Sequence, residues 1–310
     1  MRALITGGAG FIGSNLAAEL IASNHQVVVL DSLMSGFKSN LESLRGVTFI
    51  EGDVRDGDTV LRAIEGCEAV FHLAASVGNK RSIDHPITDA EINVLGTLRV
   101  LEAARQSRVR KVVISSSAGI FGELKTIPIG EDHPVEPDTP YGCTKLCEEK
   151  LGLAYAKVHS LEVVCLRYFN VYGPNQRFDA YGNVIPIFTF KLLRGEPITI
   201  FGDGSQTRDF IHVGDVVQAN LKAAEASGLS GAFNIGSGTR VSIGDLAQAL
   251  VTATGGHGRI ERGPARKGDV MHSLADIQGA ARAFGFRPSV ALGEGLAGYV
   301  SWARTEKARS

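Results

Sequence analysis

Short runs of four to six apolar, β-forming residues recur along the first half of the chain, and segments with helical periodicity separate them. The runs cover residues 3–6, 27–30, 47–50, 69–73, 111–115 and 163–166. The segments between them, at 14–22, 59–64, 94–104 and 144–155, carry Leu, Ala and Val at helical spacing. Strands that are apolar throughout and alternate with helices are typical of a parallel sheet buried on both faces. The pattern predicts a doubly wound α/β fold of the Rossmann type.

The pattern loosens after residue 173, where prolines and a glycine-rich stretch at 202–204 separate shorter elements. A last strand-like run follows at 232–235, and no Gly/Ser-rich or charged linker marks a boundary. We therefore expect a smaller α/β substrate-binding lobe that packs directly on the first, with the chain crossing between them more than once. The predicted cofactor-binding lobe comprises 1–172 and about 211–236, and the second comprises about 173–210 and 237–310.

Composition excludes several classes of protein. The 32 Lys and Arg residues balance 33 Asp and Glu residues, so no excess of positive charge favours binding to nucleic acid. No apolar stretch is long enough to span a membrane, and the start of the chain does not resemble a signal peptide. The four cysteines and eight histidines show no metal-ligand spacing. We expect a cytoplasmic protein without a metal site.

A glycine motif follows the first predicted strand directly and opens the first predicted helix. Gly7, Gly10 and Gly13 give a spacing that permits a tight turn and brings a helix N-terminus close to a pyrophosphate. Asp31 ends the second predicted strand, where an acid binds the ribose 2′-hydroxyl of a dinucleotide. Residues 32–34 contain no Arg that would neutralise a 2′-phosphate. The motif therefore favours NAD over NADP.

Tyr141 and Lys145 lie four residues apart and so share one face of a predicted helix. A neighbouring ammonium and a positively charged nicotinamide both favour phenolate, which lets a tyrosine act as an acid and base. Taken alone, the pair also suits a half-buried tyrosine beside a solvated lysine. The serine run at 115–117 decides between these interpretations, because it follows the fifth strand at the sheet edge where α/β proteins bind ligands.

Together with the segments at 53–54, 72–75, 93 and 167–170, these motifs resemble an extended short-chain dehydrogenase/reductase of the nucleotide-sugar epimerase/dehydratase group. The resemblance spans nearly the whole chain and implies NAD as cofactor and a UDP-sugar as substrate. It implies that Ser117, Tyr141 and Lys145 form the catalytic triad. It also implies a homodimer in which two helices of each subunit form a four-helix bundle, with apolar candidates at Val94, Leu98, Leu101, Leu146, Leu151 and Tyr155.

Further site residues are implied by position. The expected cofactor contacts, besides the three glycines, Asp31, Tyr141 and Lys145, are Phe11, Ile12, Ser32, Ser35, Gly36, Asp53, Val54, Leu73, Ala74, Ala75, Asn93, Ser115 and Tyr168. The expected substrate contacts, besides Ser117 and Tyr141, are Asn170, Arg177, Asn183, Val184, Arg208, Arg266, Asp269 and Ser273. His72 ends an apolar run, and we expect it to be a hydrogen-bonded structural residue. Some resembling epimerases carry a Lys a few residues beyond Ala75 that reaches the cofactor phosphates. Here Val77 and Gly78 stand nearest to that position, and Lys80 and Arg81 are displaced from it.

The residues beside the catalytic serine indicate the reaction. Resembling dehydratases carry an Asp-Glu pair there and decarboxylases carry a Glu, whereas this chain has Ala118 and Gly119. Without a carboxylate to drive a second step, a 4-keto sugar is reduced again. We therefore expect NAD-dependent epimerisation at carbon 4 of UDP-glucose and UDP-galactose through a transient ketone.

Four alternatives stay open. A small Ser273 suits the N-acetyl group of UDP-N-acetylglucosamine, and Arg177 suits the carboxylate of UDP-glucuronate. A 4,6-dehydratase and a non-catalytic NAD-binding protein are less favoured.

Overall fold

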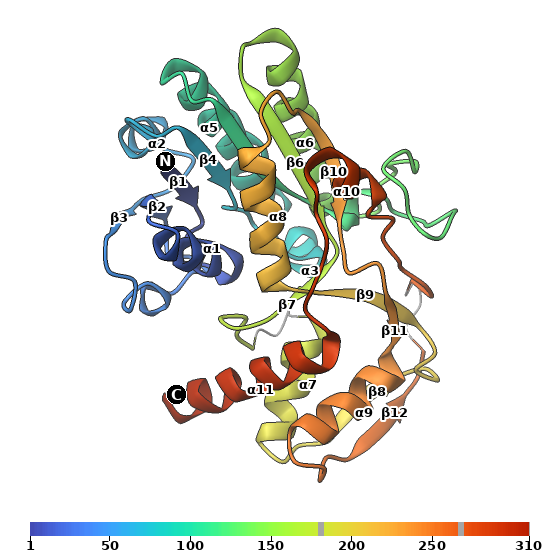
Figure 1. Cartoon of the computed structure of the whole chain (residues 1–310). Helices are drawn as coiled ribbons and strands as arrows, with labels where there is room; N and C mark the ends of the chain where they lie inside the picture. The colour runs from blue at the N-terminus through green and yellow to red at the C-terminus, as the bar shows by residue number, and fades with distance from the viewer. Residues whose placement is uncertain (179–182, 266–269, 310) are drawn as a thin grey trace.

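A parallel sheet of seven strands forms the larger part of the molecule (Figure 1). The computed structural model describes residues 1–178, 183–265 and 270–309. The strand order is β3-β2-β1-β4-β5-β6-β10, and every neighbouring pair is parallel. The strands are β1 (Arg2–Thr6), β2 (Gln26–Asp31), β3 (Val47–Glu51), β4 (Ala69–His72), β5 (Lys111–Ser117), β6 (Glu162–Tyr168) and β10 (Gly231–Ile235). This arrangement confirms the predicted doubly wound α/β fold.

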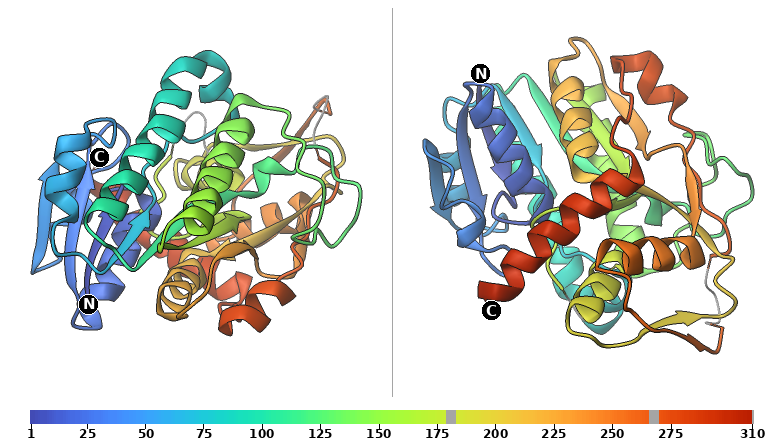
Figure 2. Two further views of the ribbon diagram at one scale, coloured as in Figure 1. Left: turned by 90° about the horizontal axis from the view of Figure 1, so that it is seen from above. Right: turned by 60° about the horizontal axis from the view of Figure 1, so that its bottom comes forward.

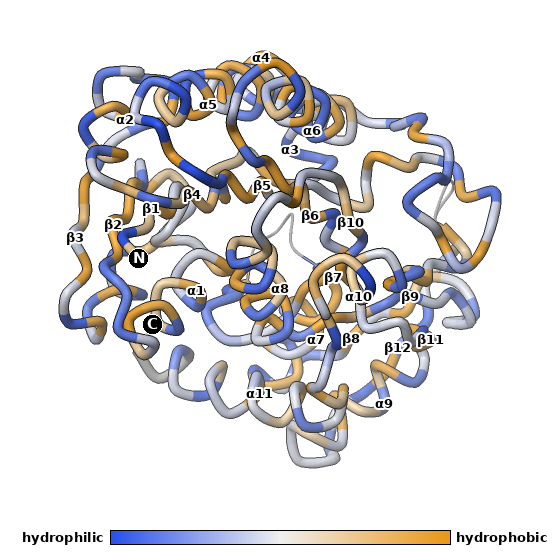
Figure 3. Tube along the Cα trace, turned by 45° about the horizontal axis from the view of Figure 1, so that its top comes forward, coloured by the Kyte–Doolittle hydropathy of each residue, from blue (hydrophilic) through white to orange (hydrophobic). Residues whose placement is uncertain are grey.

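Helices cover both faces of this sheet (Figure 2). On one face, α1 (Phe11–Ala22) and α8 (Val213–Glu225) pack against each other and against the strands. On the other face lie α2 (Gly57–Ile64), α5 (Gly96–Gln106) and α6 (Pro140–Val158). The strands between them are hydrophobic along most of their length, as Figure 3 shows for the centre of the sheet. Burial on two faces explains why their residues do not alternate between polar and apolar.

The smaller lobe is built from two short sheets and three longer helices. One sheet has the order β11 (Arg240–Ser242), β9 (Thr207–His212) and β7 (Asn170–Tyr172), and the other pairs β12 (Ile260–Gly263) with β8 (Ile198–Phe201). The helices α7 (Val184–Leu193), α9 (Ile243–Ala253) and α11 (Leu292–Arg309) contact one another. The short helix α10 (Gln278–Phe284) instead packs against β10 of the large sheet.

The chain passes between the two lobes more than once. It leaves the large sheet after β6, forms β7, β8 and β9 in the smaller lobe, and returns with α8 and β10 (Figure 1). It then re-enters the smaller lobe at β11. The exact residues at which one lobe ends and the other begins stay a prediction.

Several short helical elements complete the fold. They are η1 (Lys38–Asn40), α3 (Asn79–Asp84), α4 (Pro86–Ala90), the π-helical turn η2 (Glu91–Leu95) and η3 (Ala118–Ile120). Elements α3, α4 and η2 all contact α6 and lie between β4 and α5 in the chain. Within the described residues, no helix combines the length and the apolar character needed to cross a membrane.

Candidate functional site

A cavity of about 1000 Å³ opens at the carboxyl ends of β1, β2, β4 and β5, between the large sheet and the smaller lobe. This is the edge at which open α/β sheets bind ligands, beside the point where the strand order reverses. Most residues expected to contact cofactor or substrate line this cavity. They are Gly7, Gly10, Phe11, Ile12, Gly13, Asp31, Ser32, Ser35, Gly36, Asp53, Val54, Leu73, Ala74, Ala75, Ser115, Ser117, Tyr141, Lys145, Tyr168, Asn170, Arg177 and Asn183.

The glycine turn between β1 and α1 has no room for side chains. Gly7 adopts φ +70°, and a Cβ atom there would lie 2.7 Å from the backbone nitrogen of Ala74. A Cβ atom at Gly13 would lie 2.3 Å from the carbonyl oxygen of Gly7. No side chain caps the first turn of α1, where Gly10 is the N-cap residue. Its N–H groups therefore face the cavity, and this cradle fits the pyrophosphate of a dinucleotide.

Asp31 lies at the end of β2 on the rim of the same cavity and is 7% exposed. Its Oδ2 accepts a hydrogen bond from the backbone N–H of Ala9 at 2.9 Å, and its Oδ1 accepts one from that of Leu33 at 2.8 Å. Burial raises the pKa of this carboxyl, and the backbone donors oppose that rise. Each carboxylate oxygen has a second lone pair with which it can accept a hydrogen bond from a ribose hydroxyl.

Asp53, shortly after the end of β3, is paired with a neighbour. The guanidinium of Arg55 donates to its Oδ2 at 2.7 Å, and this hydrogen bond lowers the pKa of the Asp53 carboxyl. Its carboxylate is thus held at the rim of the cavity, next to Val54.

Ser117, Tyr141 and Lys145 meet at the other end of the cavity. Ser117 is the last residue of β5, and its Oγ accepts a hydrogen bond from the backbone N–H of Gly119 at 3.1 Å. Tyr141 and Lys145 lie in the first two turns of α6, which begins earlier than predicted. Thr139 caps this helix by accepting the backbone N–H of Gly142 at 3.1 Å, and proline follows it at the first helical position.

The electrostatic surroundings of Tyr141 combine burial with a neighbouring positive charge. Burial raises the pKa of its phenol above the ordinary value, and the Lys145 ammonium and the Ser117 hydroxyl oppose this rise without cancelling it. The ammonium alone therefore does not bring this pKa below its ordinary value; the sequence analysis expected it to act together with an oxidised nicotinamide. A second positive charge in the cavity, such as an oxidised nicotinamide, is needed to lower the pKa further.

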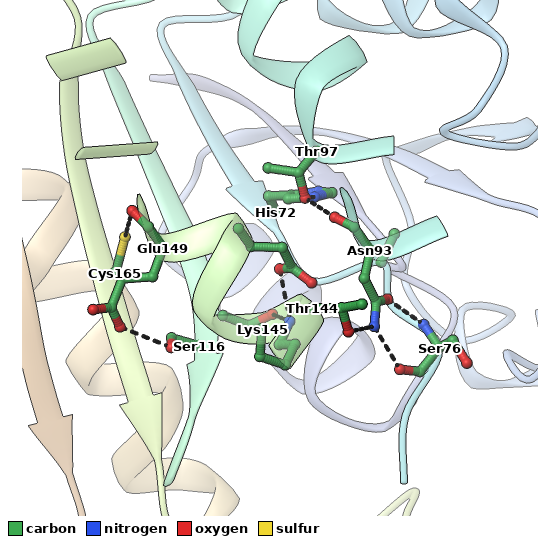
Figure 4. A network of polar contacts seen from close by, with 12 residues as sticks. His72, Ser76, Asn93, Thr97, Ser116, Thr144, Lys145, Glu149 and Cys165 are labelled. Carbon is green, nitrogen blue, oxygen red and sulfur yellow. Dashed lines mark hydrogen bonds and ion pairs between the residues drawn. The ribbon is translucent and has the colours of Figure 1, made fainter. Parts of the chain in front are cut away.

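His72 and Asn93 are fully buried, and Figure 4 shows them with Thr97 and Ser76. His72 is fully buried between the hydroxyls of Thr6 and Thr97, at 2.7 and 2.9 Å, and burial lowers its pKa to about 3. It is therefore neutral, as expected of a structural histidine. The resemblance implies a cofactor contact for Asn93, but this residue is fully buried and does not line the cavity. Its amide accepts the backbone N–H of Ser76 and donates to the carbonyl oxygen of the same residue, at 2.7 and 3.1 Å.

Several expected substrate contacts lie away from the cavity. Val184 and Ser273 do not line it, and Ser273 is 8% exposed with its backbone N–H bonded to the carbonyl oxygen of Thr207. Arg208 donates from Nη1 to the backbone carbonyls of Thr207 and Val270. These positions depend on how the smaller lobe packs, which local sequence does not determine. Arg266 and Asp269 lie outside the described residues.

Arg177 lines the cavity but is already engaged. Its Nη1 donates to Oδ1 of Asn40 at 2.8 Å, its Nη2 lies 3.1 Å from Oε2 of Glu306, and its Cζ lies 4.0 Å from the centre of the Phe37 ring. The guanidinium thus connects the segment after β2 with α11. This set of partners competes with the predicted contact to a substrate carboxylate.

Some cavity residues were not singled out from the sequence as binding residues. Asn79, Lys80 and Arg81, at the start of α3, line the cavity, although the sequence identified Lys80 and Arg81 only as displaced from the position of a lysine in resembling epimerases. The available signal was their position just after β4, at the same edge of the sheet as the glycine turn. In the part of the chain that the structure describes, no group of three His, Cys, Asp or Glu side chains is placed to hold a metal ion.

Comparison with known proteins gives consistent matches over the whole chain. Residues 3–236 match the NAD dependent epimerase/dehydratase family. The chain is 42% identical to UDP-glucose 4-epimerase of Mycolicibacterium smegmatis, over 99% of each chain. The crystal structure of UDP-glucose 4-epimerase with UDP-glucose from Thermotoga maritima superposes with a TM-score of 0.94 at 38% identity, covering 99% of this chain and 100% of that one.

A third match is the UDP-N-acetylglucosamine 4-epimerase of Methanobrevibacter ruminantium, solved in complex with UDP-N-acetylmuramic acid. Its TM-score is 0.94 at 32% identity, and the alignment covers 98% of both chains.

Proposed function

Because this chain belongs to the NAD-dependent epimerase/dehydratase family, we propose that it inverts carbon 4 of a UDP-hexose, with UDP-glucose and UDP-galactose as the preferred pair. One observation carries this proposal. Tyr141, Lys145 and Ser117 line the same cavity as the glycine turn between β1 and α1. No carboxylate lies beside these three residues in the described wall. The same three residues would also serve a dehydratase, so the choice rests on what surrounds them.

Each residue of this group has a separate role. When bound, NAD would supply a reversible hydride acceptor at carbon 4, from which the hydride could return to the opposite face of the ketone. Tyr141 removes the proton of the 4-hydroxyl as the ketone forms and gives it back afterwards. Ser117 holds the same oxygen through its hydroxyl, and Lys145 supplies positive charge next to the phenol. No net oxidation results, so we expect NAD to co-purify with the protein.

The cavity wall argues against elimination of water. Among the described residues, the carboxylates that line it are Asp31 at the end of β2 and Asp53 shortly after β3, where we expect the adenosine half of NAD. Beside the phenol, a Cβ atom added at Gly119 would lie 3.7 Å from Cε1 of Tyr141, so the wall is bare backbone there. A dehydratase needs an acid and a base near the sugar. The absence of such a pair in the described wall favours simple reduction of the ketone.

Two positions bear on the choice of sugar. The contacts of Arg177 with Asn40 and Glu306 weaken the case for UDP-glucuronate. Ser273 lies outside the cavity, so it no longer argues for an N-acetyl group. The similarity to a UDP-N-acetylglucosamine 4-epimerase nevertheless makes that sugar the second candidate.

The proposal is tested by product analysis. Purified protein is incubated separately with UDP-glucose, UDP-N-acetylglucosamine and UDP-glucuronate, and the sugars are identified by NMR. Tyr141→Phe should reduce turnover by about 10²-fold or more while the bound NAD is retained. Tyr172→Phe is the matched control, because that hydroxyl faces the carbonyl oxygen of Leu292 at 3.5 Å outside the cavity. Near-normal turnover of Tyr141→Phe, or net accumulation of NADH or of a 4-keto product, contradicts the proposal.

We also propose that the protein is a homodimer that joins through α5 and α6, as the family resemblance implies. Leu98 and Leu151, which are half-buried on these helices, are the candidate contacts.

A further inference from the structure

An acidic residue lies buried directly against the Lys145 ammonium. Nζ of Lys145 is 2.8 Å from Oε2 of Glu148, one helical turn further along α6, and 3.5 Å from Oγ of Ser115. The lysine side chain is 2% exposed and the glutamate side chain 0%. Lys145 lines the cavity whereas Glu148 does not, so Glu148 touches neither substrate nor cofactor. Its effect on the reaction is therefore electrostatic, and it acts on Lys145 and, across the helix turn, on Tyr141.

Glu148 differs from the neighbouring Glu149, which has a purely structural environment. Both oxygens of Glu149 are bound by the guanidinium of Arg167, at 2.7 and 2.9 Å, and one also accepts the hydroxyl of Ser116 (Figure 4). Oε1 of Glu148, by contrast, has no hydrogen-bond partner among the described residues. A buried carboxylate with an orphaned oxygen is costly. It persists here beside a single cation, the one that faces Tyr141.

The charged and titratable groups around Glu148 come from several elements. Asp89 of α4 is fully buried and interacts electrostatically with Glu148, Lys145 and Tyr141. His72 of β4 is neutral, because burial and the Lys145 charge both lower its pKa. On β6, burial and the charges of Glu149 and Glu148 raise the pKa of the Cys165 thiol, and Arg167 is paired with Glu149. On α6 itself, burial and the Glu148 charge raise the pKa of the Cys147 thiol. Lys145 is thus the cation in contact with Glu148.

We propose that Glu148 is a positioning residue for Lys145: its carboxylate holds the ammonium beside Ser115 and opposes the positive charge that Lys145 presents to Tyr141. This inference rests on the proposed role of Tyr141 as the acid and base. The Glu148 carboxylate disfavours the phenolate form of Tyr141, so that Tyr141 ionises only when a further positive charge enters the cavity.

The sign of the effect follows from the neighbouring charges. Burial raises the pKa of Glu148 to about 7 although Lys145 opposes this, so Glu148 titrates near neutrality. When it is ionised, it raises the pKa of Tyr141. Burial alone would lower the pKa of Lys145, but Glu148 contributes most to holding that pKa above its usual value. Removing the carboxylate should therefore lower both pKa values.

The test is the pH dependence of Glu148→Gln in the NAD-loaded protein. Both limbs of the kcat profile should move to lower pH, by about 1 unit, because phenolate forms earlier and the ammonium is lost earlier. A residue with a merely structural role would lower the stability or the amplitude and leave both limbs in place. Glu148→Asp keeps the charge and should restore the wild-type profile. Glu91→Gln, which removes an exposed carboxylate paired with Arg55, is the matched control and should not shift it.

A second measurement does not depend on turnover. The phenolate of Tyr141 is titrated by ultraviolet difference spectroscopy against Tyr141→Phe, in the wild-type and the Glu148→Gln backgrounds, with NAD bound. A lower midpoint in Glu148→Gln supports the inference even if no UDP-sugar is epimerised, which would contradict only the proposed function. An unchanged midpoint overturns the inference even if epimerisation is observed. If Glu148→Gln does not fold, Glu148→Ala replaces it, with the same expected direction.

Discussion

Gly13 lies where α1 passes directly over the turn that follows β1, and backbone atoms surround its Cα hydrogens. A methyl group there would lie 2.3 Å from the carbonyl oxygen of Gly7, and backbone cannot move aside as a side-chain end can. We expect Gly13→Ala to lower the NAD content of the purified protein strongly, and to lower its stability by about 1–3 kcal/mol. Gly298→Ala is the control, since a Cβ atom added at that exposed glycine of α11 would meet no other atom within 4 Å.

The measurements are NAD content after gel filtration and the free energy of unfolding in denaturant. Gly298→Ala should be slightly more stable, by about 0.5–1 kcal/mol, because alanine favours the helix. Gly13→Ala with a full complement of NAD would show that the close approach in the turn is not needed for binding.

At the same scale, the sequence predicted those site residues whose place follows from local order. Gly7, Gly10, Asp31 and Tyr141 lie at strand ends or helix starts, and parallel strands bring such positions to one edge. Arg208 and Ser273 could not be placed in this way, because their surroundings depend on how distant segments pack. Glu148 was also missed, since its significance lies in what it touches and not in a motif.

Helices α5 and α6 lie side by side on one face of the sheet, and a hydrogen bond from Tyr155 to Glu102 joins them at 2.6 Å. Leu98 and Leu151 are half-buried on these helices, whereas Leu101 is fully buried in the core and is not available to a partner. We predict a mass of about twice 32.9 kDa by light scattering. Leu98→Glu should yield single chains, because it places a charge in the expected interface.

The control for this variant is Ile260→Glu, at a residue that is 38% exposed on β12 of the smaller lobe. It should leave the mass of the assembly unchanged. A wild-type protein that elutes and scatters as a single chain would exclude the four-helix arrangement at the concentration used.

Element boundaries illustrate what a hydrophobic pattern captures. The predicted run at 111–115 matches the beginning of β5, but the strand continues to Ser117 through polar residues at the sheet edge. Likewise α6 begins at Pro140, before its apolar positions, because the Thr139 cap and not burial determines its start. Hydrophobicity locates the parts of an element that are buried, whereas capping and ligand-facing residues extend it.

The two lobes are joined by a contact centred on Arg177. Its guanidinium stacks on Phe37 and bonds to Asn40 in the segment after β2, and it pairs with Glu306 of α11 at the far end of the chain. A substrate that binds between the lobes needs them held at a fixed separation. Arg177→Ala should therefore raise KM for the UDP-sugar about fivefold, which corresponds to about 1 kcal/mol, with kcat little changed.

Steady-state kinetics of the variant provides the measurement. Arg177→Lys should not restore the wild-type KM, because an ammonium cannot stack and donate in two directions at once. Lys125→Ala serves as the control, since Lys125 pairs with Glu136 on the exposed surface and neither residue lines the cavity. A fall in kcat with unchanged KM would mean that Arg177 acts on the chemical step and not on the separation of the lobes.

The position of β10 at the margin of the large sheet has a consequence for biosynthesis. Residues 231–235 pair with β6, yet they are synthesised after β7, β8 and β9 of the other lobe. Until the ribosome has passed them, β6 presents an unpaired edge, and such an edge invites aggregation. The nascent polypeptide thus cannot finish its amino-terminal half first and its carboxyl-terminal half later, so the two halves must mature together.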